Sequence, residues 1–246
     1  METDAPTPPF QLNQKLDLQL LASAYRGSRR VRIANLLATA GADRLYRHLD
    51  GEVRWRTFIV ANQRQMATDP AAGSITPDEE REMIEHAGRA THNGFASVLE
   101  ADALHRDGEA ADDARDTLLD SIHLFLNSPD LLRICRVVTG IAELNHVATR
   151  ATRLRCGHFA TFHDATESAD PTGKRRVNFS LNLTPHWQPE WGGLLCFRGE
   201  QDCIEGLQPS FNTLDLFRFP QGHWISPVAQ FAPGSRYAIS GFICVD

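Results

Sequence analysis

The sequence predicts an α+β protein in which a jelly roll of short strands is covered by helices packed outside it. Before residue 150, apolar residues recur mainly at helical spacing, and helix-start signals precede several of these stretches. After residue 150, short alternating or apolar stretches are separated by glycine, proline and asparagine. We therefore expect residues 1–10 as a flexible leader, 11–150 as a mainly helical part and 151–246 as the strand-rich core of one functional unit.

The composition excludes several classes of function. The 246 residues are 42% hydrophobic and carry a formal net charge of -6, which argues against the basic surface that nucleic-acid backbones require. The five cysteines are scattered and form no C-x-x-C pair, so neither a disulfide framework nor a zinc ribbon is indicated. With no signal-peptide pattern and no apolar run long enough to cross a bilayer, we expect a cytoplasmic protein that acts on neither nucleic acid nor membrane.

Capping residues mark two of the predicted helices. Thr76 supplies an N-cap hydroxyl before a proline, and Glu79 follows at the position that completes a capping box. Ser128 precedes a second proline, and Gly140 is a typical helix stop. We expect helices over about 77–105, 112–126 and 129–140, and two more helices around a short strand within 16–49.

A strict alternation of apolar and polar residues identifies one strand clearly. It covers residues 177–184, with apolar side chains on one face and Asn178, Ser180 and Asn182 on the other, which is typical of a half-buried strand. Further strands are expected over about 193–197, 213–219, 223–231 and 236–245.

The order of two histidines and an arginine along the strand-rich half indicates a candidate metal and ligand site. His163 lies in the stretch Gly157–Ala165, His223 follows a Gly-Gly pair at 192–193, and Arg236 comes further downstream. This order resembles the prolyl-4-hydroxylase-like branch of the Fe(II)/2-oxoglutarate oxygenases, which have a double-stranded β-helix. The resemblance covers most of the chain and is most specific over about 152–242.

The resemblance implies a role for each of these side chains. His163 and His223 would bind Fe(II), for which two neutral imidazoles are suitable ligands, and leave coordination positions for 2-oxoglutarate and dioxygen. Arg236 would hold the far carboxylate of 2-oxoglutarate through paired hydrogen bonds. The implied reaction is oxidation of an unactivated C–H bond in a small-molecule or carrier-bound substrate. A protein side chain remains an open alternative, and the sequence predicts no oligomeric state.

The sequence departs from the family pattern at three positions. The family's iron-binding carboxylate belongs two residues after His163, where this chain has Ala165. Leu154 replaces a tyrosine, and Ala238 replaces a serine, that help many relatives hold 2-oxoglutarate. Since alanine cannot bind iron, the identity of the third iron ligand decides the chemistry.

Three explanations compete for Ala165. In the preferred one, the motif His-x-Ala resembles that of radical halogenases, in which chloride occupies the place of the carboxylate. In the second, Asp164 or Glu167 replaces the missing ligand and the enzyme is an ordinary hydroxylase. In the third, the pocket binds a ligand without oxidising it, as the changes at Leu154 and Ala238 would allow.

Two further residues are candidates for the substrate side of the site. Arg176, next to Arg175, opens the alternating strand and is placed to attract an anionic substrate or cosubstrate. Trp224 is adjacent to His223 and is expected near the substrate, whereas Trp187 and Trp191 are better explained by core or rim packing.

Overall fold

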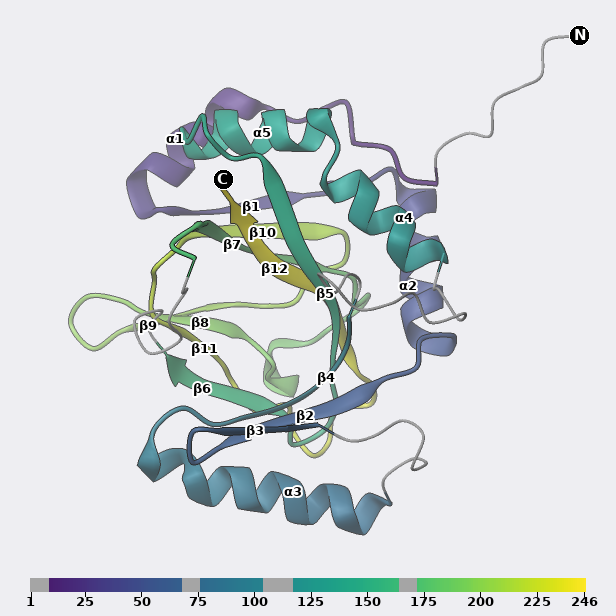
Figure 1. Cartoon of the computed structure of the whole chain (residues 1–246), viewed down its shortest axis with the longest axis vertical. Helices are drawn as coiled ribbons and strands as arrows, with labels where there is room; N and C mark the ends of the chain where they lie inside the picture. Colours follow the sequence, from purple (N-terminus) through teal and green to yellow (C-terminus); the bar gives the residue numbers. More distant parts are fainter. Residues whose placement is uncertain (1–8, 68–75, 104–116, 164–171) are drawn as a thin grey trace, which may run out of the picture.

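The computed structural model of the chain describes residues 9–67, 76–103, 117–163 and 172–246. Its strands form one curled antiparallel sheet, and five helices lie outside that sheet (Figure 1). The helices are α1 (Leu18–Ser28), α2 (Thr39–Gly51), α3 (Pro77–Ala90), α4 (Thr117–Leu126) and α5 (Pro129–Thr139), with the short 3-10 turns η2 (Thr91–Asn93) and η3 (Pro189–Trp191). The strands are β1 (Arg30–Ala34), β2 (Arg56–Ala61), β3 (Arg64–Ala67), β4 (Ser97–Ala103), β5 (His146–Leu154), β6 (Phe159–His163), β7 (Arg175–Asn182), β8 (Leu195–Arg198), β9 (Ile204–Leu207), β10 (Thr213–Arg218), β11 (His223–Ile225) and β12 (Arg236–Cys244).

The sheet curls into two facing walls. Its strand order is β1-β10-β7-β12-β5-β4-β6-β11-β8-β9, with β2 joined to β4 and β3 joined to β2. Strands β1, β10, β7, β12 and β5 make the larger wall, and β6, β11, β8 and β9 make the smaller one (Figure 1). This arrangement confirms the predicted double-stranded β-helix with helices outside.

The main hydrophobic core lies between the larger wall and helices α1, α2, α4 and α5 (Figure 1). From β7, Val177, Phe179 and Leu181 belong to this core. The polar residues that alternate with them are buried too, so the expectation of a half-buried strand was wrong. Helices cover one face of β7 and the opposite wall of the barrel covers the other, which turns its polar side chains toward the interior.

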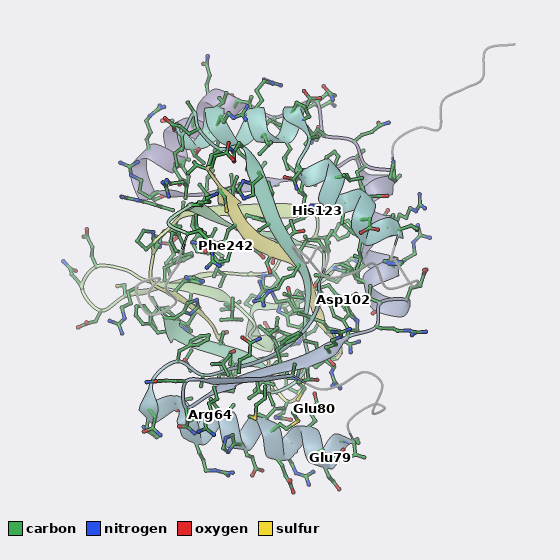
Figure 2. The ribbon with its side chains drawn as sticks, in the orientation of Figure 1. Arg64, Glu79, Glu80, Asp102, His123 and Phe242 are labelled. Atoms are coloured by element: carbon green, nitrogen blue, oxygen red, sulfur yellow. The ribbon has the colours of Figure 1, made fainter. Side chains whose placement is uncertain are left out.

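Helix α3 lies against the sheet extension formed by β2, β3 and β4 (Figure 1). Glu80, labelled on this helix in Figure 2, accepts hydrogen bonds at 2.9 Å from His158 Nε2 and at 2.5 Å from Arg155 Nη2. These contacts attach the helix to the segment between β5 and β6, which leads directly to His163.

Most predicted helix boundaries are confirmed, with one correction. Thr76 and Glu79 form the expected capping box of α3, and Ser128 and Gly140 cap α5 at its two ends. The helix expected to reach residue 105 ends at Ala90 instead. Gly94 has a positive φ of 119° that no helix accommodates, and the residues after it pair with β2 and β5 as strand β4.

The elements in the remaining predicted stretches also differ in detail. The two helices and intervening strand expected within 16–49 are α1, β1 and α2. Helix α4 begins at Thr117, and residues 104–116 lie outside the described part of the chain. The strand expected over 223–231 ends at Ile225, because Pro227 follows closely and has no N–H to donate to the sheet. Strands β2, β3, β5 and β9 were not expected.

The sheet is not confined to residues 151–246. Strand β1 pairs with β10, and β4 pairs with both β5 and β6, so the mainly helical part contributes strands to the same barrel. Residues 1–8 of the expected flexible leader lie outside the described residues. Phe10, at the end of that leader, is only 3% exposed, because its ring packs into the core under the helices. Its ring centroid lies 5.9 Å from that of Phe125. None of the helices in the described residues is long and apolar enough to cross a membrane.

Candidate active site

His163 and His223 face each other across neighbouring strands of the smaller wall. His163 in β6 and His223 in β11 are direct cross-strand partners, and their ring centroids lie 4.2 Å apart. The register between β6 and β11 shifts immediately after this pair. The two candidate iron ligands, distant in sequence, are therefore brought together by strand pairing.

Hydrogen bonds to the backbone orient both imidazoles in the same way. His163 Nδ1 lies 3.1 Å from the carbonyl oxygen of Thr161, and His223 Nδ1 lies 2.9 Å from that of Gln221. A carbonyl only accepts, so each Nδ1 carries the hydrogen and each Nε2 carries the lone pair that binds a metal. In metal-binding histidines, a hydrogen bond from the ring nitrogen that does not bind the metal fixes the orientation of the ring, and both histidines have such a bond here.

The surroundings keep His223 neutral. The pKa of His223 is lowered to about 4, mainly by burial and also by the neighbouring His163, against the opposing effect of the Gln221 carbonyl. The ring centroids of Phe95 and His163 lie 4.7 Å apart, and those of Phe217 and His223 lie 4.8 Å apart. Both rings therefore sit in an apolar setting, and His223 is held as the neutral imidazole that suits Fe(II).

The predicted vacant position lies outside the described residues, together with its possible substitutes. Ala165, Asp164 and Glu167 all fall within residues 164–171. In the described part of the chain, no group of three or more His, Cys, Asp or Glu side chains is placed to hold a metal ion. The described metal-binding groups of this site are thus the two imidazoles.

Arg236 lies at the start of β12 on the larger wall, as the cross-strand partner of Leu154. Its side chain is only 4% exposed, and its Nη2 donates a 3.2 Å hydrogen bond to Asn182 Oδ1. The pKa of Arg236 is lowered to about 10, mainly by burial, with Asp215 acting to raise it and Arg32 to lower it. Its Nε is buried and has no hydrogen-bond partner in the described structure, so this guanidinium can accept an anionic ligand.

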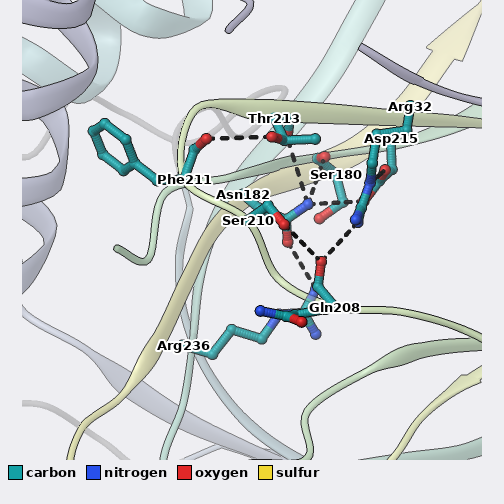
Figure 3. Close-up of polar contacts among 9 residues, drawn as sticks. All are labelled: Arg32, Ser180, Asn182, Gln208, Ser210, Phe211, Thr213, Asp215 and Arg236. Carbon is teal, nitrogen blue, oxygen red and sulfur yellow. Dashed lines mark hydrogen bonds and ion pairs between the residues drawn. The ribbon is translucent and has the colours of Figure 1, made fainter. Parts of the chain in front are cut away.

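A chain of polar contacts behind Arg236 holds it in place (Figure 3). Asn182 donates through Nδ2 to Asp215 Oδ2 at 2.9 Å while it accepts from Arg236. Asp215 in turn accepts two hydrogen bonds from Arg32, at 2.7 and 2.9 Å. The guanidinium is therefore fixed by an amide and keeps its charge for a ligand, because Arg32 neutralises the nearby carboxylate.

The two histidines and Arg236 line the same cavity, which has a volume of about 540 Å³. A buried arginine with an unpaired Nε suits a carboxylate-bearing chelator, and two facing imidazoles suit Fe(II). The residues present therefore fit both the metal and the keto acid. Arg236 would hold the carboxylate, and the paired Nε2 atoms would hold the iron.

Neither of the two predicted substrate-side residues, Arg176 and Trp224, lines the cavity. The larger wall has a β-bulge where β7 begins, between the pairs Val177–Ile243 and Arg175–Cys244. The extra residue places Arg175, and not Arg176, in the cavity lining. Arg176 instead donates from Nη1 to the carbonyl oxygens of Gly173 and Arg175 at 2.8 and 2.9 Å.

Trp224 is also turned away from the candidate active site. It follows His223 in β11, and successive strand residues point to opposite faces. Its ring packs 6.2 Å from Phe162 and does not line the cavity. Trp187 and Trp191 pack against each other at 5.4 Å in a small cluster with Leu154, as their packing interpretation predicts.

Leu154 and Ala238 lie where the resemblance places them, near Arg236. Leu154 lines the cavity with an apolar side chain, and Ala238 is the cross-strand partner of both Thr152 and Asn182. The polar contact to Arg236 comes from Asn182, whose role sequence reasoning missed. The polar alternation of β7 was the available signal, because a polar face within a barrel is a candidate ligand-binding face.

The fold is shared with solved structures of low sequence identity. A prolyl-4-hydroxylase from Pseudomonas putida matches with a TM-score of 0.57 and 15% identity, covering 93% of this chain and 99% of that one. An oxidoreductase of the 2OG-Fe(II) oxygenase family from Burkholderia pseudomallei has a TM-score of 0.62 and 13% identity, covering 96% and 93%. The non-heme alpha-ketoglutarate-dependent epimerase SnoN of nogalamycin biosynthesis has a TM-score of 0.56 and 9% identity, covering 92% and 81%. No curated protein matches the sequence significantly.

The fold is a double-stranded β-helix, and its paired histidines are placed to bind a metal ion. Residues 149–244, somewhat less than half of the chain, match the model of the 2OG-Fe(II) oxygenase superfamily. The matched stretch contains both histidines and Arg236, and the match supports an oxidoreductase that depends on Fe(II), 2-oxoglutarate and dioxygen.

Proposed function

We propose that this oxidoreductase functionalises an unactivated C–H bond and that its preferred outcome is radical halogenation. The observation that carries the oxidative part is the His163–His223 pair, which shares one cavity with Arg236. The halogenation part is supported by Ala165, two residues after the first ligand. A methyl group there leaves room for chloride, which would supply the negative charge of the missing carboxylate.

Each residue has a distinct task in this proposal. His163 and His223 present Nε2 to the metal because their Nδ1 atoms are bonded to carbonyls. Arg236, positioned by Asn182, binds the far carboxylate of the keto acid. Fe(II) held by these residues would supply the oxidising chemistry, in which a C–H bond, chloride, a proton, 2-oxoglutarate and dioxygen give C–Cl, water, succinate and carbon dioxide.

The substrate in this proposal is a small or carrier-bound molecule. A cavity of about 540 Å³ is within the range of sites that enclose small ligands. Aromatic and aliphatic side chains make up much of its wall, including Phe58, Leu99, Phe219 and Phe242. An apolar wall beside the metal site suits a substrate whose reacting carbon carries no polar group.

The first test is an anaerobic titration of the purified protein with Fe(II) and 2-oxoglutarate, with chloride or with sulfate at equal ionic strength. We expect the visible charge-transfer band of the iron–keto acid complex to appear, and to shift with chloride and not with sulfate. A band without any chloride response would favour the hydroxylase alternative, in which Asp164 or Glu167 is the third ligand. If no band appeared and no iron bound, both the halogenase proposal and the hydroxylase alternative would be contradicted.

The second test restores the carboxylate with Ala165→Asp. A carboxylate there would compete with chloride for the metal, so we expect the apparent chloride affinity to fall at least about tenfold, the effect of about 1.4 kcal/mol. The matched control is Ala165→Gly, which keeps the position vacant and should keep the chloride response. If Ala165→Asp left the chloride-dependent shift unchanged, the halide would not occupy this position.

A further inference from the structure

A second arginine faces the cavity from the larger wall, in addition to Arg236. Arg150 on β5 is the cross-strand partner of Ser240 on β12, which is in turn the partner of Ser180 on β7. All three line the cavity. One guanidinium and two hydroxyl groups therefore lie in a single row across three adjacent strands.

Arg150 has no ion-pair partner in the described part of the chain. Its side chain is accessible to solvent, yet it lies within the walls of the cavity. The pKa of Arg150 is lowered first by this enclosure and then by the positive charge of Arg175. An anion bound beside Arg150 would relieve that repulsion, whereas a neutral or cationic ligand would not.

Aromatic rings flank this cationic end of the cavity. The Arg175 guanidinium lies 4.0 Å from the centroid of Phe242, which is labelled in Figure 2, and Phe219 packs 5.7 Å from the same ring. Both phenylalanines line the cavity. The region thus combines positive charge with an apolar wall, which suits an anionic group attached to an apolar body.

Arg150 is separate from the arginine expected to hold 2-oxoglutarate. Leu154 is the strand partner of Arg236, and Arg150 lies four residues before Leu154 on the same face of β5. At about 3.3 Å per residue, this is about 13 Å along the strand. The cavity therefore offers two positions for anions, one of which remains when the keto acid occupies the other.

We propose that Arg150, together with the hydroxyl groups of Ser180 and Ser240, binds the carboxylate or phosphate group of an otherwise apolar substrate. Arginine can hold either anion through two parallel hydrogen bonds, and each serine can donate one more. This substrate class rests on the proposed function for its chemical fate, but binding of the anion does not require iron. The two can therefore fail separately.

The test is isothermal titration calorimetry with small probes, on the protein saturated with 2-oxoglutarate and on the protein without it. The probes are 3-phenylpropionate, hexanoate, phenyl phosphate and the neutral 3-phenylpropanamide. We expect at least one anionic probe to bind at least tenfold more tightly than the amide, with saturating 2-oxoglutarate present. The preferred anion, carboxylate or phosphate, identifies the charged group of the substrate.

Variants separate this subsite from the one at Arg236. Arg150→Met should weaken binding of the anionic probe at least tenfold without changing that of the amide, and Arg150→Lys should retain most of the affinity. Both should keep the wild-type melting temperature and 2-oxoglutarate affinity, since Arg150 has no ion pair with a described residue to lose. Equal binding of acid and amide, no effect of Arg150→Met, no binding of any anionic probe, or displacement of the probe by 2-oxoglutarate would each overturn the proposal. If the probe binds as expected while iron does not, the subsite stands and the proposed reaction fails.

Discussion

His223→Ala is expected to abolish stable Fe(II) binding. The two imidazoles are the described ligands of the site, and their rings lie 4.2 Å apart with both Nδ1 atoms bonded to carbonyls. Loss of a group that merely orients a metal ligand costs about 10–100-fold in affinity, so loss of the ligand itself should exceed about 100-fold. Anaerobic equilibrium dialysis with Fe(II) measures this directly, and His163→Ala should have the same effect.

The matched control for these variants is His146→Gln. His146 is exposed, bonds only to the side chain of its neighbour Asn145 among the described contacts, and does not line the cavity. Iron binding should therefore stay at the wild-type level in this variant. Circular dichroism and melting temperature establish that each alanine variant is folded. A folded His223→Ala protein that binds iron as well as the control would show that the metal lies elsewhere.

The sequence was sufficient to predict the helices and several of the core strands, but not β2, β3, β4, β5 or β9, nor which faces of the barrel strands are buried. Alternation over residues 177–184 indicated a strand, and it is β7. The same alternation could not show that Asn178, Ser180 and Asn182 are enclosed, because that depends on a second wall formed by β6, β11, β8 and β9. Hydrophobic periodicity reports one apolar face, and it does not distinguish solvent from a polar cavity on the other.

The site was predicted unevenly for a similar reason. The order of His163, His223 and Arg236 carries a family pattern, so a shared cavity was expected and is present. Support from Asp215 and Arg32 depends on pairing between β1 and β10, two strands far apart in the sequence. No local signal encodes such a contact.

The substrate side depended on single-residue geometry that the sequence conceals. A β-bulge at the start of β7 exchanges Arg176 for Arg175 in the cavity wall. Trp224 points away because its neighbour His223 points inward, so adjacency along a strand was the wrong criterion for proximity to the site. Arg150 and Ser240 were not singled out, since nothing in β5 or β12 alone shows that they share a row with Ser180.

Arg236→Met is expected to remove 2-oxoglutarate binding while leaving the fold intact. A hydrogen bond to a charged group contributes about 1.5–3 kcal/mol. Loss of a bidentate pair should therefore reduce the binding free energy of 2-oxoglutarate by about 3 kcal/mol or more, which lowers its affinity at least about 100-fold. Fe(II) binding should persist, because both imidazoles lie on the opposite wall. Titration of the iron-loaded protein with 2-oxoglutarate, followed through the charge-transfer band, measures the loss.

Stability distinguishes a binding role for Arg236 from a structural one. Its Nε has no partner, and its main described hydrogen bond is the 3.2 Å contact to Asn182, so burial of this charge is poorly compensated within the protein. Replacing such a group by methionine, of similar length, should change the free energy of unfolding by no more than about 1 kcal/mol. Asp215 would not be left unpaired, because it retains both hydrogen bonds from Arg32.

Two further variants complete the comparison. Arg236→Lys keeps the charge but loses the planar pair of donors, so it should retain part of the 2-oxoglutarate affinity, about tenfold below wild type. Arg176→Met serves as the arginine control, because Arg176 bonds to backbone carbonyls of its own loop and does not line the cavity. A structural role would instead lower the melting temperature of Arg236→Met together with its affinity. Unchanged affinity in that variant would mean that the keto acid binds elsewhere in the barrel.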